Sequence, residues 1–160
     1  MALLNIRPAT VADAGLILHF IRELAIYEKA EHSVQTDEIG IAESLFGADA
    51  TARALICEAD GEPIGYAVYF YNYSTWLGRK GIYLEDLYVS QEKRGAGAGK
   101  ALLKYIARQA VAEGCGRFEW SVLDWNTPAI EFYTAAGATP QDEWTVYRLQ
   151  GQALHDFANG

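Results

Sequence analysis

Two adjacent carboxylates, Glu85 and Asp86, stand inside an otherwise apolar stretch just before a glycine-rich turn. The stretch 82–89 is rich in β-branched and aromatic residues, which predicts a strand. A charged side chain in such a strand must point into a cleft or find a partner. A carboxylate in a cleft is a candidate general base, and Glu85 is the candidate here. The alternative is that both acids are structural, as ion-paired or hydrogen-bonded groups within the sheet.

Side-chain alternation along this strand predicts two faces, one with Tyr83, Glu85 and Leu87 and the other with Leu84, Asp86 and Tyr88. A β-bulge would change which acid faces the cleft, because it adds one residue to the alternation. The sequence therefore leaves open which of the two acids points into the site.

A glycine-rich turn, Arg94-Gly95-Ala96-Gly97-Ala98-Gly99-Lys100, follows the strand and precedes a predicted helix. The helix is indicated by apolar residues at helical spacing, with Gly114 at its end: Leu102, Leu103, Ile106, Ala110 and Val111. Unpaired N–H groups at a helix N-terminus bind anions, and glycines let an anion approach the backbone closely. We therefore expect a phosphate site; the alternative is a flexible Gly/Ala turn.

The spacing of the turn excludes two common phosphate motifs. The Walker pattern needs glycine at position 94 and Ser or Thr after Lys100, where the chain has Arg94 and Ala101. The dinucleotide pattern needs a glycine at position 100 or 102, and neither position has one. The pattern present is Arg-x-x-Gly-x-Gly, at Arg94, Gly97 and Gly99, and it resembles the acetyl-CoA motif of the GNAT superfamily of N-acetyltransferases.

This resemblance implies that acetyl-CoA is the cosubstrate. No metal is expected, because the histidines show no metal-ligand spacing. The backbone amides of the turn would bind the CoA pyrophosphate, with Arg94 or Lys100 adding charge. The implied cofactor-binding residues are Leu87, Tyr88, Val89, Arg94, Gly95, Ala96, Gly97, Ala98, Gly99, Lys100 and Asn126. Of these, Leu87 and Val89 would hold the pantetheine arm and the thioester through their backbone groups, and Asn126 would contact the arm.

Acetyl transfer to an amine requires a base, because a free alkylamine has a pKa near ~10, and it benefits from an acid that protonates the departing CoA thiolate. Glu85 is the candidate base. Tyr133 by itself reads as helix-face packing, but the resemblance implies that it is the acid.

Four segments, 24–28, 71–78, 83–86 and 122–126, resemble the diamine (spermidine/spermine) acetyltransferase group. The resemblance implies that Tyr27, Glu28, Trp76 and Glu85 line the amine site, with the rings of Tyr27 and Trp76 offering cation–π faces. The polyamine-specific branch carries an acid before the tryptophan, whereas this chain has Ser74-Thr75, as in the thialysine branch.

These features predict an acetyl-CoA-dependent N-acetyltransferase that acts on a small cationic amine such as thialysine or a lysine-like diamine. The alternatives are a polyamine (spermidine/spermine) acetyltransferase and a catalytically silent CoA-binding module. The presence of both Glu85 and Tyr133 favours an active enzyme.

Composition limits the partners. The net charge of −8 argues against a nucleic-acid partner, and the three histidines and two cysteines show no metal-ligand spacing. We find no signal peptide and no apolar run long enough to cross a membrane, so a cytoplasmic location is expected. The resemblance implies a homodimer.

The elements that must position these residues follow from periodicity and turn signals. Strands are predicted at 3–7, 52–59, 64–73, 82–89, 118–123 and 144–149, with a hairpin turn at 60–62. Helices are predicted after a capping box at 10–13, ending near 27–29, and from a start at 36–38 to a stop at Gly47. Further helices are predicted after the glycine-rich turn, from 128 to about 136 with Thr127 as N-cap, and at 151–158. This pattern predicts one α/β (α+β) domain over 1–160, with a mixed, mostly antiparallel sheet and helices on both faces.

Overall fold

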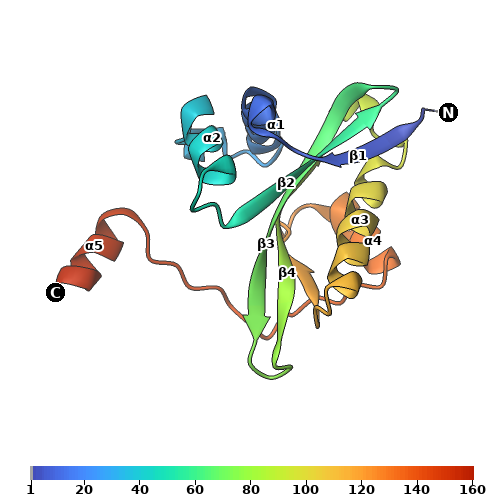
Figure 1. The fold of residues 1–160 in the computed structure, drawn as a ribbon. Helices are drawn as coiled ribbons and strands as arrows, with labels where there is room; N and C mark the ends of the chain where they lie inside the picture. The colour runs from blue at the N-terminus through green and yellow to red at the C-terminus, as the bar shows by residue number, and fades with distance from the viewer. Residues whose placement is uncertain (1) are drawn as a thin grey trace. The chain divides into compact units, whose positions relative to one another are not determined.

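A five-stranded sheet in the order β1-β2-β3-β4-β5 carries the fold in the computed structural model, which describes residues 2–160 (Figure 1). Its strands are β1 (Leu4–Pro8), β2 (Ala52–Ala59), β3 (Glu62–Ser74), β4 (Arg79–Val89) and β5 (Phe118–Trp120). The first four strands pair antiparallel and β5 pairs parallel to β4. The predicted mixed, mostly antiparallel sheet is therefore confirmed.

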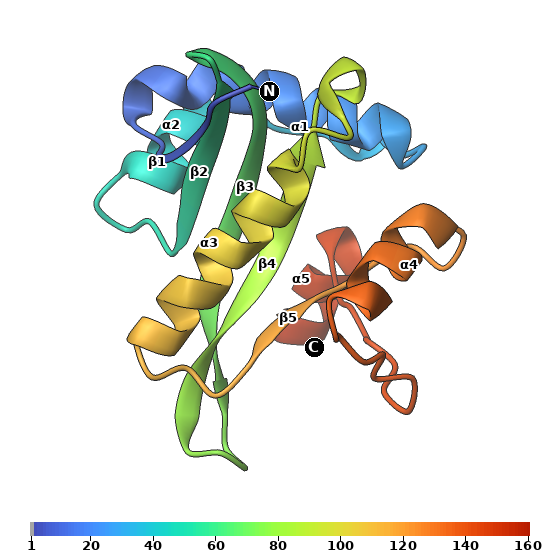
Figure 2. The same cartoon turned by 90° about the vertical axis from the view of Figure 1, so that its right-hand side faces the viewer.

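Helices cover both faces of this sheet, as predicted. The helices α1 (Ala14–Tyr27) and α2 (Glu38–Phe46) pack on one face, and α3 (Ala98–Ala112) packs on the other (Figures 1 and 2). The first face encloses a core cluster that includes Ile17, Phe20, Leu24, Tyr66, Val68 and Tyr88. Four of the five apolar α3 residues are buried, and the exception is Val111, which is 80% exposed. Three short 3-10 helices complete this part: η1 (Val11–Asp13), η2 (Glu31–Ser33) and η3 (Gln91–Lys93).

A β-bulge in β4 changes the predicted alternation of side chains. Val68 of β3 pairs with Asp86, but the next residue, Tyr69, pairs with Leu84, so Glu85 is the extra residue. Paired residues share a face, and neighbours on β3 lie on opposite faces. Asp86 therefore shares the face of Tyr88, as predicted, but Leu84 lies on the opposite face. The prediction that Leu84 and Asp86 lie together is wrong because the bulge adds one residue between them.

The edge of β4 that faces β5 is paired over only part of its length. Ladder pairs join Ile82, Tyr83 and Leu84 to β5, and no described ladder pair continues from Glu85 to Val89. The predicted strand at 118–123 is thus shorter, ending at Trp120. The ladder between the two parallel strands therefore ends at the bulge, and the β4 backbone beyond it has no ladder partner on this side among the described residues.

The described chain forms two compact units, Met1–Ser121 and Val122–Gly160. The second contains α4 (Thr127–Ala135) and α5 (Gly151–Asn159). The N-cap of α4 is Asn126 rather than the predicted Thr127, because the Asn126 side chain accepts a hydrogen bond from the Ala129 amide. None of the described helices is both long and apolar enough to cross a membrane. One domain over 1–160 stays a prediction.

The predicted strand at 144–149 is wrong. These residues form no ladder with any strand among residues 2–160. A strand needs a partner strand to satisfy its backbone groups, and periodicity does not supply one. Four of its apolar side chains are instead at least half exposed: Trp144, Val146, Tyr147 and Leu149.

Candidate active site

The glycine-rich turn adopts the backbone conformation that an anion site needs. Gly95 and Gly97 have φ values of +90° and +85°, in the left-handed region that favours glycine. Gly97 is the N-cap of α3, and its carbonyl accepts the amide of Ala101 at 2.9 Å. The amides of the first helical turn precede the first intrahelical acceptor. They are available to an anion at the positive end of a 15-residue helix.

Replacement of Gly97 by Val should weaken CoA binding by about tenfold or more, the equivalent of one charge-assisted hydrogen bond. No heavy atom lies within 4 Å of a Cβ built at Gly97, so the fold has room for the side chain. The new side chain would fill the space in front of the amides and strain the positive φ. Isothermal calorimetry with CoA measures the loss.

Gly114→Val is the matched control for the backbone strain. Gly114 also has a positive φ (+73°) and open space around its Cβ, but it lies after the opposite end of α3. Both variants should lose similar thermal stability, and only Gly97→Val should lose CoA affinity. Unchanged affinity in a folded Gly97→Val protein would remove the phosphate site from this turn.

The unpaired edge of β4 leads from the bulge to the glycine-rich turn. Beyond Leu84, no ladder with β5 occupies this edge among the described residues, and it contains Leu87, Tyr88 and Val89. Backbone groups on this edge that have no ladder partner can hydrogen-bond an extended chain that carries amides. The three predicted cofactor-binding residues of β4 therefore lie beside the turn, at the end of the strand.

Asp86 is the more enclosed of the two predicted acids. Its side chain is half-buried and accepts a 2.5 Å hydrogen bond from the hydroxyl of Tyr66, which is fully buried. Burial raises the pKa of Asp86, and the hydrogen bond from Tyr66 opposes the shift. Glu85, at the bulge, is exposed.

Glu28, the residue after α1, lies close enough to Asp86 for their charges to interact. The helix stops because Lys29 takes a positive φ of 60° and the Ala30 amide bonds back to Ala25 at 2.8 Å. Burial raises the pKa of Glu28, and the negative charge of Asp86 raises it further. Two half-buried carboxylates that repel each other form a site that a cationic group would stabilise.

Tyr27, the last residue of α1, belongs to the same region. Its side chain is 36% exposed, and the Arg94 guanidinium carbon lies 4.9 Å from the centre of its ring. The structure thus brings Tyr27, Glu28 and Asp86 together with the end of β4. Glu28 and Tyr27 were predicted as amine-site residues, whereas the pairing of Glu28 with Asp86 was not foreseen. The only signal of this pairing in the sequence was the presence of Asp86 in an otherwise apolar strand.

Trp76 lies in the turn of the β3–β4 hairpin, 87% exposed, and Figure 1 shows this hairpin at the end of the sheet away from α1. Trp76 and Glu28, which both belong to the first unit, therefore do not lie together, although both were predicted to line the amine site. Ser74, next to it, is only 4% exposed, and its hydroxyl accepts the Leu77 amide at 3.2 Å. Ser74 therefore stabilises the hairpin turn and does not present its hydroxyl to a substrate.

Two predicted residues lie in the second unit. Asn126 is 8% exposed and caps α4, so its placement has a structural role in addition to the predicted contact with the pantetheine arm. Tyr133 lies on α4, half-buried, with its ring 5.6 Å from that of Phe132. Their roles toward acetyl-CoA stay predictions.

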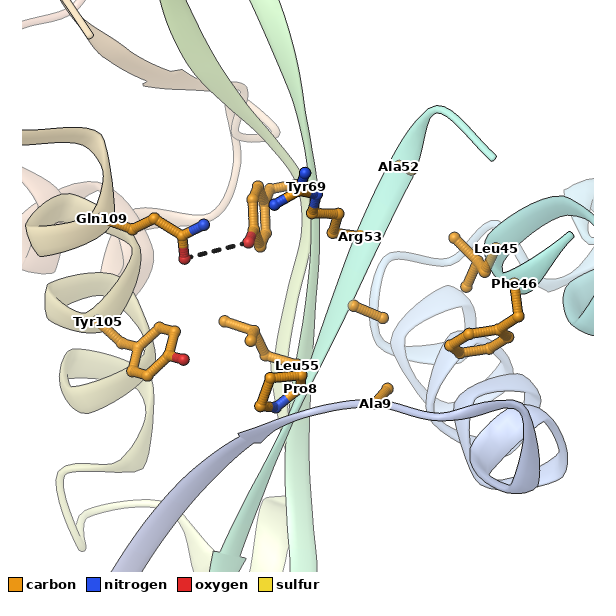
Figure 3. A pocket seen from close by; sticks show the side chains of 11 residues that line it. Pro8, Ala9, Leu45, Phe46, Ala52, Arg53, Leu55, Tyr69, Tyr105 and Gln109 are labelled. Atoms are coloured by element: carbon orange, nitrogen blue, oxygen red, sulfur yellow. Dashed lines mark hydrogen bonds between the residues drawn. The ribbon is translucent and has the colours of Figure 1, made fainter. Parts of the chain in front are cut away.

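A pocket of about 360 Å³ lies elsewhere, between the end of β1, α2 and α3 (Figure 3). Its lining includes Arg53, Tyr105 and the hydrogen-bonded pair Tyr69 and Gln109, whose side-chain oxygens are 3.2 Å apart. It contains none of the predicted site residues. We therefore do not assign this pocket to the candidate active site.

Comparison with known proteins defines the class. The model of the acetyltransferase (GNAT) family matches residues 19–138. The chain therefore belongs to the acetyltransferase (GNAT) family, and it is an amine N-acetyltransferase by its full-length similarity to enzymes of that kind.

The individual relatives cover nearly the whole chain. It is 41% identical to thialysine N-epsilon-acetyltransferase from Bos taurus, over 99% of both chains. It is 31% identical to L-ornithine N5-acetyltransferase from Arabidopsis thaliana, over 94% of this chain and 86% of that protein. Among solved structures, an integron cassette protein from V. cholerae is similar with a TM-score of 0.82, 25% identity and 98% of each chain covered.

Proposed function

We propose that this enzyme transfers acetyl from acetyl-CoA to a primary amine of a small diamine of the thialysine or lysine type. The observation that carries the proposal is the carboxylate pair of Glu28 and Asp86 beside the unpaired edge of β4. The pair suits one ammonium group of the amine, and the edge suits the amide-bearing arm of the cosubstrate. Acetyl-CoA is the donor that GNAT enzymes use.

The cosubstrate would lie along β4 and end on the glycine-rich turn. The turn amides from Gly95 to Lys100 would bind its pyrophosphate, and Lys100, exposed in the first turn of α3, would add charge. Backbone groups of Leu87, Tyr88 and Val89 would hold the pantetheine arm. The thioester would then lie near the bulge, where the ladder between β4 and β5 ends.

The reaction needs one proton removed and one supplied. The amine nitrogen attacks the thioester carbonyl carbon, the carbon–sulfur bond breaks, and the acetyl group ends on nitrogen. Glu85, exposed at the bulge beside Asp86, is the proposed base that takes the amine proton. Tyr133 is the proposed acid that protonates the CoA sulfur.

Purified protein should release CoA from acetyl-CoA only when an amine is added, and thialysine or lysine should give about tenfold higher kcat/KM than spermidine. The charges of Glu28 and Asp86 interact, so together they would suit a short molecule with two ammonium groups. Spermidine carries a further ammonium that would need its own partner, and one missing charge-assisted contact costs about tenfold. A thiol assay at fixed pH measures both values.

The outcomes separate the alternatives. A higher kcat/KM with spermidine would identify a polyamine acetyltransferase. CoA binding without amine-dependent release would identify a catalytically silent module. Substitution of Ser74 is not a suitable probe of this preference, because its buried hydroxyl holds the hairpin turn.

We also propose that the enzyme acts as a homodimer. The exposed apolar side chains of the segment 144–149 support it, together with Leu154 and Phe157 of α5, because a single chain leaves them in contact with water. A second copy of the chain is a suitable cover for them.

A further inference from the structure

Arg94 links the glycine-rich turn to two other elements. Its Nε donates a hydrogen bond to the main-chain oxygen of Val89 at 3.1 Å, at the end of β4. Its guanidinium carbon lies 4.9 Å from the ring centre of Tyr27 and 5.5 Å from that of Tyr88. The side chain therefore contacts the last residue of α1 and the end of β4, although its backbone belongs to the turn.

Each of these two rings belongs to a residue near one of the two carboxylates, Glu28 or Asp86. Tyr27 directly precedes Glu28 in the chain. Tyr88 lies on the same face of β4 as Asp86 and packs in the core cluster, with its ring 6.1 Å from that of Phe20. Burial raises the pKa of the Tyr88 hydroxyl, and the Arg94 charge opposes that shift. Arg94, which belongs to the glycine-rich turn, thus contacts two residues that adjoin the proposed amine site, Tyr27 and Tyr88.

We propose that Arg94 is a positioning residue that couples acetyl-CoA binding at the turn to the placement of Tyr27 and Glu28 in the amine site. This role rests on the proposed function. A pyrophosphate on the turn amides fixes the backbone at Gly95, the next residue, and so fixes Arg94. Its guanidinium then holds the Tyr27 ring at the end of α1, which sets the position of Glu28.

The chemistry of the side chain suits this role. A planar guanidinium can stack on an aromatic face while its Nε donates in a fixed direction, whereas a lysine ammonium keeps the charge and loses this combination. The geometry also leaves Lys100 as the exposed cation in the first turn of α3. Coupling between two sites is reciprocal, so the amine must increase CoA affinity by the same factor.

Arg94→Lys separates coupling from phosphate binding, because it keeps the charge. In calorimetry without amine, CoA affinity should stay within about twofold of wild type, while the KM of thialysine at saturating acetyl-CoA should rise about fivefold. The increase in CoA affinity caused by saturating thialysine should be lost. Tyr27→Leu should raise the amine KM similarly, and the double variant should be no worse than Tyr27→Leu alone.

Arg108→Lys is the matched control, since Arg108 is exposed on α3 away from the turn, and it should change none of these values. A fivefold loss of CoA affinity in Arg94→Lys without amine, or an unchanged thialysine KM, would overturn the proposed role. Wild-type protein without amine-dependent CoA release would overturn the proposed function instead. In that case the CoA titration still tests whether Arg94 is a phosphate ligand.

Discussion

Tyr133→Phe is expected to lower kcat by about 10²-fold or more while the affinity for CoA stays the same. A positioned general acid contributes roughly 10²–10⁴-fold, and the substitution removes only the hydroxyl that would protonate the thiolate. The interaction is made mainly in the transition state, so kcat and kcat/KM should fall together. Steady-state kinetics with thialysine and calorimetry with CoA measure the two quantities.

The same variant distinguishes catalysis from packing. Phenylalanine keeps the ring that packs near Phe132, so a purely structural Tyr133 would tolerate the change. Tyr73→Phe is the matched control, because Tyr73 is 62% exposed near the end of β3 and belongs to no proposed site. Wild-type kcat in Tyr133→Phe would assign the residue to packing.

Asp86→Asn is expected to lower kcat/KM for diamines by about tenfold to a hundredfold, mainly through KM. It removes one charge of the carboxylate pair, and a charge-assisted contact contributes ~1.5–3 kcal/mol. The amide oxygen of asparagine can still accept the hydrogen bond from Tyr66. Asp49→Asn, at an exposed position in the loop before β2, makes the same change in net charge and should have no effect.

The Asp86→Asn protein should be more stable than wild type at neutral pH, although its activity is lower. An acid with a raised pKa holds its proton to higher pH in the folded state, so the contribution of Asp86 to the wild-type stability is fully present below the ordinary pKa of 3.8 and is lost as pH rises through the raised value. The Asp86→Asn variant has no ionisable group at this position, so it does not lose stability in this way as pH rises. We expect a higher Tm than wild type at pH 7 and no difference below about pH 3.8. A lower Tm at neutral pH would contradict a desolvated carboxylate at this position.

Glu85→Gln tests whether Glu85, rather than its neighbour Asp86, is the base. As the proposed base, Glu85 should matter most when the amine is protonated, so the variant should lose activity at pH 7 and partly recover toward pH 10. A constant ratio of variant to wild-type rates over this range would argue against Glu85. Asp86 would then be the better candidate for the base.

Local patterns in the sequence determined most of the elements. The spacing of apolar residues and the glycine after it predict α3, and helix geometry leaves the first amides after its turn without intrahelical acceptors. The Asp60-Gly61 hairpin forms for a similarly local reason, since both residues take a positive φ. The resemblance supplied the roles of Glu28 and Tyr133, which spacing does not define, whereas the place of Glu85 in an apolar strand already made it the candidate base.

Tertiary structure decided which groups meet. Alternation could not reveal the bulge at Glu85, because a bulge is defined by the register with β3. The pairing of Glu28 with Asp86 joins residues 58 positions apart in the numbering, and the contact of Arg94 with Tyr27 joins residues 67 positions apart. The segment 144–149 has the composition of a strand but no ladder among the described residues. A strand depends on its partner, whereas a helix satisfies its own backbone, and this is why the sequence determined the helices and the turn while the fold determined the site.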